Sequence, residues 1–262
     1  VMDLPQMKKD KDYKKWAEEI YELKEKLEKL TGNIITEERL AEAIKLCNKK
    51  RKALQRLYDA RKELNVPISG KDALLISQIA FYDNPERFIE MTNNLCDELE
   101  ERIKNGVAIN KKGDKRILIA GTPMAVPNWK IHHIIETCDA IVVAEETCTG
   151  TRYFENLVDE SAKTMDEMVK ALADRYLKIN CACFTPNKGR QDDIIRLAKE
   201  YKADGVIYNS LQFCHTYNIE YANVEKALKA AGIPVLFIES DYSNEDVGQI
   251  QTRVEAFLEM IG

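Results

Sequence analysis

The sequence predicts an α/β protein: a four-stranded parallel sheet with flanking helices, preceded by an all-helical region. Four apolar runs of strand length carry this prediction, at 116–121, 140–145, 205–210 and 234–239. They alternate with stretches of helical periodicity, and both faces of each run are apolar, which is typical of buried parallel strands. No strand pattern of this kind precedes residue 113. Together these observations predict a Rossmann- or flavodoxin-like sheet.

Residues 1–112 are expected to contain only helices. Apolar residues recur at helical spacing in 10–31, and "TGN" ends that helix. Thr36 caps a second helix, which "NVPISG" ends, and a short helix follows through "ALLISQIAF". Asn84-Pro85 opens a fourth helix, with proline at its first position. Because "VMDLP" resembles the end of a strand and a loop, we expect this region to include the tail of an upstream domain that is missing here.

Residues 113–262 are expected to form the α/β domain. Helices are predicted between its strands and after the last one, at 128–137, 164–177, 190–202, 221–231 and 247–261. In such a sheet, ligands bind outside the carboxyl ends of the strands. The loops that follow the strands are therefore the places to look for function.

Composition excludes several classes of protein. The net charge is −5 with a pI near 5.5, which argues against general affinity for nucleic acid or anionic membranes. No apolar run is long enough to span a bilayer, and the first residues contain no secretion signal. Seven cysteines, an odd number, indicate a reducing compartment rather than a disulfide framework. We expect a cytoplasmic protein.

The seven cysteines separate into two groups by position. Cys47 and Cys96 lie on or beside apolar helix stripes, and Cys138 precedes a strand at the opposite rim of the sheet, so packing explains these three. Four others lie in loops that can reach the carboxyl rim: Cys148, Cys181, Cys183 and Cys214. We expect these four thiols to form a shared site.

Thiolates suit soft metal ions and iron–sulfur clusters. Structural zinc sites use C-x2-4-C pairs, which this chain lacks, so zinc is disfavoured. Cys181-x-Cys183 with distant single cysteines fits an iron–sulfur cluster better, and a cysteine nucleophile beside His215 is the competing interpretation.

Other polar residues near this rim have less specific signals. Arg152, in "CTGTR", is a candidate for holding an anion, or simply an exposed arginine in a loop before a helix. "GTPMAVPN" after the first strand is a candidate pocket wall, or simply a turn. His132 and His133 are expected to be surface or packing groups. The nucleotide-binding patterns G-x-G-x-x-G and G-x-x-x-x-G-K-[ST] are absent.

Three segments also carry a family resemblance: "AEETCTGTRYFENLVDE", the stretch from "CACFTPNKGR" to "GVIYNSLQFCHTYN", and "GQIQTRVEAFLEM". The chain resembles the 2-hydroxyacyl-CoA dehydratase / benzoyl-CoA reductase family, and most closely its branch of double-cubane iron–sulfur cluster proteins. Members of that family are longer at the N-terminus.

The resemblance implies an oxygen-sensitive cluster, either 4Fe–4S or double-cubane 8Fe–9S, and a homodimer. It implies an ATP-dependent iron–sulfur activator as the electron donor. Cys214 matches the cysteine shared across the family, whereas Cys148, Cys181 and Cys183 match the additional cysteines of the double-cubane branch. His215 and Arg152 are the candidates for a proton donor and an anion holder.

The predicted function is therefore an iron–sulfur reductase component that takes low-potential electrons and reduces a small substrate. The first alternative is a component of a 2-hydroxyacyl-CoA dehydratase, in which the electrons form a ketyl radical anion that expels a hydroxyl group. The second alternative is a cluster-free association module.

Overall fold

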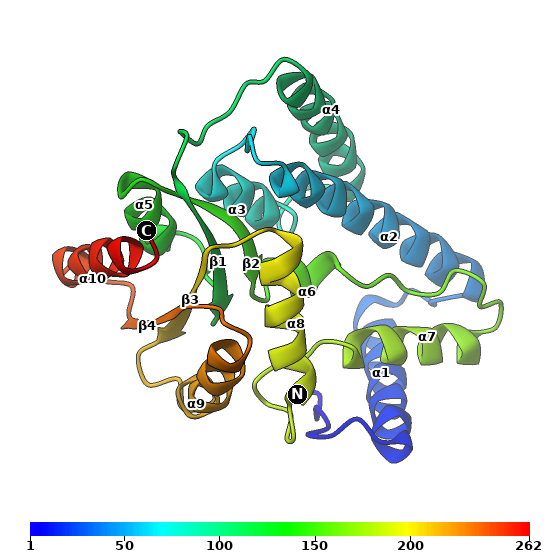
Figure 1. Cartoon of the computed structure of the whole chain (residues 1–262). Helices are drawn as coiled ribbons and strands as arrows, with labels where there is room; N and C mark the ends of the chain where they lie inside the picture. Colours follow the sequence, from blue (N-terminus) through cyan, green and yellow to red (C-terminus); the bar gives the residue numbers. More distant parts are fainter.

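The computed structural model describes residues 1–262 and contains one parallel sheet (Figure 1). Its strands are β1 (Lys115–Gly121), β2 (Ala140–Glu146), β3 (Gly205–Leu211) and β4 (Val235–Ser240). The strand order is β2-β1-β3-β4, and every neighbouring pair is parallel. The predicted α/β fold with a four-stranded, flavodoxin-like sheet is confirmed.

Helices cover both faces of the sheet. α5 (Lys130–Thr137) and α10 (Val247–Met260) pack on one face, where Ile117, Ile119 and Ile207 contribute to a core. α6 (Thr151–Phe154), α8 (Lys188–Glu200) and α9 (His215–Ala230) pack on the other face. The two cores lie on opposite sides of the strands because side chains alternate along a strand.

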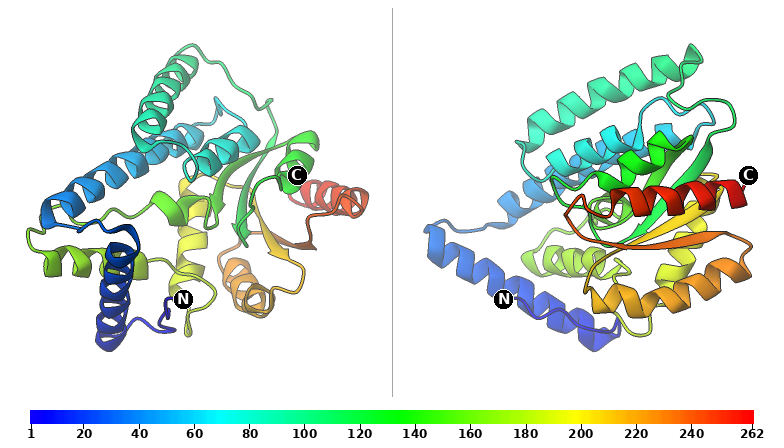
Figure 2. Two further views of the ribbon diagram at one scale, coloured as in Figure 1. Left: turned by 180° about the vertical axis from the view of Figure 1, so that it is seen from behind. Right: turned by 90° about the vertical axis from the view of Figure 1, so that its left-hand side faces the viewer.

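The preceding helices lie beside the sheet (Figure 1). They are α1 (Asp10–Thr31), α2 (Glu37–Asp59), the 3-10 helix η1 (Ala60–Lys62), α3 (Gly70–Ile79) and α4 (Pro85–Lys104). Leu54, Leu57 and Tyr58 of α2 share one core with strand residues. α1 instead packs beside α7 (Met165–Leu177), as Figure 2 also shows, and none of its residues is buried.

Two details differ from the sequence prediction. α9 begins at His215, whereas the sequence predicts a start at 221, and the short α6 has no counterpart among the predicted helices. The first turn of α9 carries His215, Thr216 and Asn218, which have modest helix propensity, so periodicity shows only from residue 221 onward. Four residues are too few for a helical period to be visible.

A β-bulge in β2 decides which way its last residues point. Ile117 pairs with Val142 and Leu118 with Ala144, so Val143 has no partner in β1. Val143 and Ala144 consequently face the same core. The extra residue shifts the alternation by one, and Glu146 therefore points toward α6 and α8, whereas Glu145 points toward α5.

None of the helices combines the length and the apolar character that crossing a bilayer requires.

Candidate functional site: a thiol-lined rim

Three separate loops bring the four predicted cysteines toward the carboxyl edge of the sheet. Cys148 follows β2, and Cys214 is the residue before α9, after β3. Cys181 and Cys183 lie between α7 and α8, and Cys181 Sγ is 4.0 Å from the Tyr217 hydroxyl on the first turn of α9. The loop before α8 therefore reaches the same edge.

Arg152 of α6 lies at the base of this rim and is only 6% exposed, so the expectation of an exposed arginine is wrong. Its Nη1 donates to the Tyr217 hydroxyl at 2.6 Å and lies 3.8 Å from Cys148 Sγ. Its Nε and Nη2 bind the carboxylate of Glu146, the Nη2 contact being 2.7 Å. The contacts around this guanidinium thus link the end of β2 to two of the thiol-bearing loops.

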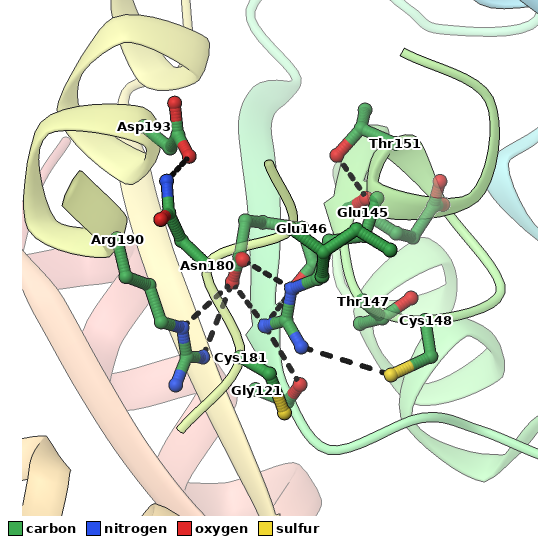
Figure 3. Close-up of polar contacts among 12 residues, drawn as sticks. Gly121, Glu145, Glu146, Thr147, Cys148, Thr151, Asn180, Cys181, Arg190 and Asp193 are labelled. Atoms are coloured by element: carbon green, nitrogen blue, oxygen red, sulfur yellow. Dashed lines mark hydrogen bonds and ion pairs between the residues drawn. The ribbon is translucent and has the colours of Figure 1, made fainter. Parts of the chain in front are cut away.

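Arg190 of α8 binds the same carboxylate and is fully buried. In Figure 3 the Glu146 carboxylate lies between Arg190 and Cys148. Burial alone would raise the pKa of Glu146, but the charges of Arg152 and Arg190 outweigh it and lower the pKa below its ordinary value. Glu146 is therefore an anion held between two cations.

The network continues to the backbone of the Cys181 loop. Arg190 also pairs with Glu220 of α9, and Asn187 donates to a Glu220 oxygen at 2.6 Å. The same Asn187 amide donates to the Cys181 carbonyl at 2.8 Å. One continuous set of hydrogen bonds thus joins β2, α8, α9 and the loop that carries Cys181.

The two neighbouring thiols of this loop are not equivalent. A hydrogen bond from Cys183 lowers the pKa of Cys181 to about 5, although burial acts in the opposite direction. The same hydrogen bond raises the pKa of Cys183. The charge of Arg152 and the Tyr217 hydroxyl also favour the Cys181 thiolate. The surroundings of Cys181 therefore favour its deprotonated form over that of Cys183.

Cys214 and His215 occupy the outer part of the rim. Cys214 is half-buried and its Sγ lies 3.6 Å from the Thr216 hydroxyl. His215 is at the start of α9, where its side chain is not fully covered. The structure thus brings Cys148 and Cys181 together through Arg152 and Tyr217, whereas Cys214 and His215 share the same edge of the sheet without a direct contact to that pair.

Sequence reasoning did not single out Glu146, Arg190 or Tyr217. A charged residue at the end of the apolar run "AIVVAEE" is the signal for Glu146, because a buried carboxylate requires a cationic partner. Tyr217 lies three residues after Cys214, which places it within one helical turn of that cysteine. Arg190 has no comparable signal in the sequence.

The cysteines assigned to packing lie elsewhere. Cys96 is buried in the core shared by α2, α4 and the sheet, and Cys47 and Cys138 are half-buried. His132 is fully buried and binds Glu145 at 2.9 Å, so it is a packing group with a charged partner.

The rim offers soft thiol donors, and the structure shows no preformed site for a single metal ion. Nowhere do three or more His, Cys, Asp or Glu side chains lie close enough together to hold one ion. The rim instead offers free thiols on three loops, one of them with a strongly lowered pKa. Soft, separated thiolates are the donors that a multi-iron cluster takes, since each iron needs only one of them.

A cavity of about 360 Å³ lies on the α5 and α10 side of the same edge. Pro127, Asn128, Trp129 and Tyr242 are among its lining residues, and none of the cysteines is. The last two residues of "GTPMAVPN", Pro127 and Asn128, thus lie in a cavity wall, and a functional role for this segment stays a prediction.

The model of a protein family described as 2-hydroxyglutaryl-CoA dehydratase, D-component, matches residues 1–261. The chain belongs to this family. The expected resemblance to the 2-hydroxyacyl-CoA dehydratase / benzoyl-CoA reductase family is thus confirmed, whereas membership of its double-cubane branch stays a prediction. Family members are subunits of dehydratase and reductase enzymes.

Individual relatives agree with this assignment. YjiM of Escherichia coli K12, provisionally named a dehydratase subunit, is 36% identical over 265 residues, covering all of this chain and 67% of YjiM. The beta subunit of (R)-phenyllactyl-CoA dehydratase of Clostridium sporogenes is 26% identical, covering 98% of this chain and 67% of the relative. One of the subunits of benzoyl-CoA reductase of Thauera aromatica is 24% identical, covering 90% of this chain and 59% of the relative.

Proposed function

We propose that the chain is an iron–sulfur component of a cytoplasmic enzyme, which receives low-potential electrons from an ATP-dependent iron–sulfur activator and passes them to a small substrate. The observation that carries the proposal is the convergence of free thiols from three loops at the carboxyl edge of the sheet. Cys148, Cys181, Cys183 and Cys214 are the proposed ligands. A homodimer is part of this proposal.

When bound, a cluster would supply single-electron chemistry at a potential that its surroundings set. The residues of the chain have separate tasks. The loops after β2 and β3 present thiols at the carboxyl edge of the sheet, and the buried Glu146 and its two arginines hold the base of the rim in place. His215 follows Cys214 directly and is the proposed proton donor. The sequence predicts Arg152 as an anion holder, and in the structure its guanidinium contacts the sulfur of Cys148.

Two forms of substrate chemistry are candidates. The number of rim cysteines favours a double-cubane-like reductase that acts on a small molecule. The names of YjiM and of the phenyllactyl-CoA dehydratase relative favour radical dehydration of a 2-hydroxyacyl-CoA. Dehydration of a hydroxyacyl-CoA in the presence of the activator would support the second candidate over the first.

The proposal is tested by metal analysis of the protein purified without oxygen. We expect iron and acid-labile sulfide at about four or more per chain, the content of one cubane. Zinc alone, or no metal with every thiol titratable, would support the cluster-free association module and refute the proposal.

A pair of serine variants then tests the sorting of the cysteines. Cys214→Ser should lose most of the iron, because it removes a ligand at the rim. Cys96→Ser is the matched control, since Cys96 lies in the core and is 1% exposed. It should retain its iron per folded chain. Equal iron contents in the two variants would contradict the sorting.

A further inference from the structure

The guanidinium of Arg152 has no donor left for a substrate. Arginine carries five N–H groups. Nε binds Glu146; Nη2 binds the Glu146 carboxylate at 2.7 Å, the Glu146 carbonyl at 3.0 Å and the Gly121 carbonyl at 3.3 Å; and Nη1 reaches Tyr217 and Cys148. With the side chain almost entirely buried, an added anion would have to displace one of these partners.

Tyr217 connects the Arg152 guanidinium to the loop that carries Cys181. Its hydroxyl oxygen accepts the Arg152 N–H at 2.6 Å, so its own O–H group remains to donate. Cys181 Sγ lies 4.0 Å from that hydroxyl. The side chain is 6% exposed, and its ring lies under the Arg152 and Arg190 guanidinium groups at 5.7 and 4.6 Å. Tyr217 is therefore held both at its hydroxyl group and along its ring.

Cys148, Arg152, Tyr217 and Cys181 thus form one unbroken row of contacts across the rim, and the cysteines at its two ends are 33 residues apart in the sequence. We propose that Arg152 and Tyr217 are positioning residues, which hold the sulfurs of Cys148 and Cys181 toward one shared ligand and supply positive charge and a hydrogen bond to those sulfurs. This inference rests on the proposed function.

The expected consequence is electrostatic. Hydrogen bonds and positive charge next to cluster sulfurs stabilise the reduced, more negative state and so raise the reduction potential. Glu146 anchors the pair but is fully paired itself, with Arg152 and Arg190 on either side. Loss of the Tyr217 hydroxyl should therefore shift the potential to more negative values while the thiols remain available to bind.

The inference is tested by comparing the variants Tyr217→Phe and Tyr58→Phe. Tyr58 is also a buried tyrosine that hydrogen-bonds into a carboxylate network, at 2.5 Å from Glu145, and its hydroxyl bonds to no sulfur. The readouts are iron content and the midpoint potential from a redox titration followed by electron paramagnetic resonance. We expect Tyr217→Phe to keep its iron and shift the midpoint to lower potential, and Tyr58→Phe to match the unmodified protein.

An unchanged midpoint in Tyr217→Phe, or an equal shift in Tyr58→Phe, would overturn the inference. A failure of the proposed function is recognised separately, because the unmodified protein would then contain no iron. In that event the row of contacts can still be tested on the metal-free protein, by measuring the rate at which iodoacetamide alkylates each cysteine. Tyr217→Phe should change the alkylation rate of Cys181 by about threefold or more and leave that of Cys214 unchanged. Equal rates at Cys181 in the variant and the unmodified protein would overturn the inference.

Discussion

Glu145 and Glu146 are adjacent, buried carboxylates with two cationic or imidazole partners each, yet they serve different parts of the molecule. Glu145 binds Arg61 of η1 and His132 of α5, and it accepts from Tyr58 of α2. Glu146 binds Arg152 and Arg190, and its network ends at the thiols. The first joins the helical region to the sheet, whereas the second supports the rim.

The chemistry of a buried ion pair alone therefore does not reveal its role. Both carboxylates have lowered pKa values, since in each the neighbouring partners outweigh the effect of burial. The two carboxylates differ in the groups that their arginine partners contact in turn. Beyond Arg61 lie the β2 backbone and the Tyr58 ring, and beyond Arg152 lie Tyr217 and Cys148.

The largest expected effect comes from breaking the first network. Glu145→Gln leaves Arg61 and His132 buried without their anion, which should lower the free energy of unfolding by about 3–5 kcal/mol. Urea unfolding monitored by circular dichroism measures this loss, and iron per folded chain should not change. Glu98→Gln is the control, because the surface pair of Glu98 with Arg102 is worth at most about 1 kcal/mol. Loss of iron in Glu145→Gln would contradict the claim that only the Glu146 network supports the thiols.

Acid should weaken the first network through the same carboxylate. Burial would raise the pKa of Glu145, but Arg61 and His132 hold it at about 2, below its ordinary value of 4.5. A lowered folded-state pKa means that the unfolded chain binds more protons, so this stability is present above pH 4.5 and is lost as the pH falls toward 2. The loss amounts to about 3 kcal/mol.

Urea unfolding of the unmodified protein and of Glu145→Gln at several values between about pH 5 and pH 3 measures this contribution. The stability of the unmodified protein should fall more steeply with acid, because the variant has one titrating carboxylate fewer. Parallel curves for the two proteins would show that Glu145 does not contribute in this range.

The smallest change in stability is expected at Gly150, in the turn that follows the two glutamates. A Cβ on Gly150 would lie 2.2 Å from the Glu145 carbonyl oxygen, so Gly150→Ala should displace the start of α6, which carries Arg152. We expect a loss of about 1–3 kcal/mol in the free energy of unfolding, together with a lower iron content. Gly248→Ala in α10 is the control, since nothing lies within 4 Å of its added Cβ. It should be neutral or slightly stabilising. An equal outcome in both variants would contradict the close packing at Gly150.

Much of the fold was predictable because it depends on local patterns. The four strands lie within one or two residues of their expected positions, since apolar runs bounded by polar loops have few other ways to be buried. Thr36 and Ser69 cap α2 and α3 with their side chains, as residues of that type do at helix starts. The start of α9 escapes prediction because its first turn, apart from Tyr217, is polar and carries no apolar repeat.

The candidate site was predictable only in part. Strand order and the position of each loop place Cys148 and Cys214 at the carboxyl edge, and this follows from parallel topology alone. Arg190 of α8, which binds Glu146, lies 44 residues after it, and Tyr217 of α9, which accepts from Arg152, lies 65 residues after that arginine. No local sequence pattern indicates either pairing. Arg152, which the sequence marks as an exposed arginine or an anion holder, is buried because these distant helices cover it.

Residue order alone is enough to predict the class of fold and the position of Cys148 and Cys214 at the carboxyl edge of the sheet, because hydrophobic periodicity and parallel topology depend on it. The family follows from the resemblance carried by the cysteine-bearing segments. Residue order does not reveal which of the two adjacent glutamates supports the thiols, and three-dimensional packing settles it. A single extra residue in β2, Val143, turns Glu146 toward α6 and α8 and Glu145 toward α5. The physical reason is that side-chain direction along a strand has a period of two, so one bulge exchanges the faces of every residue beyond it.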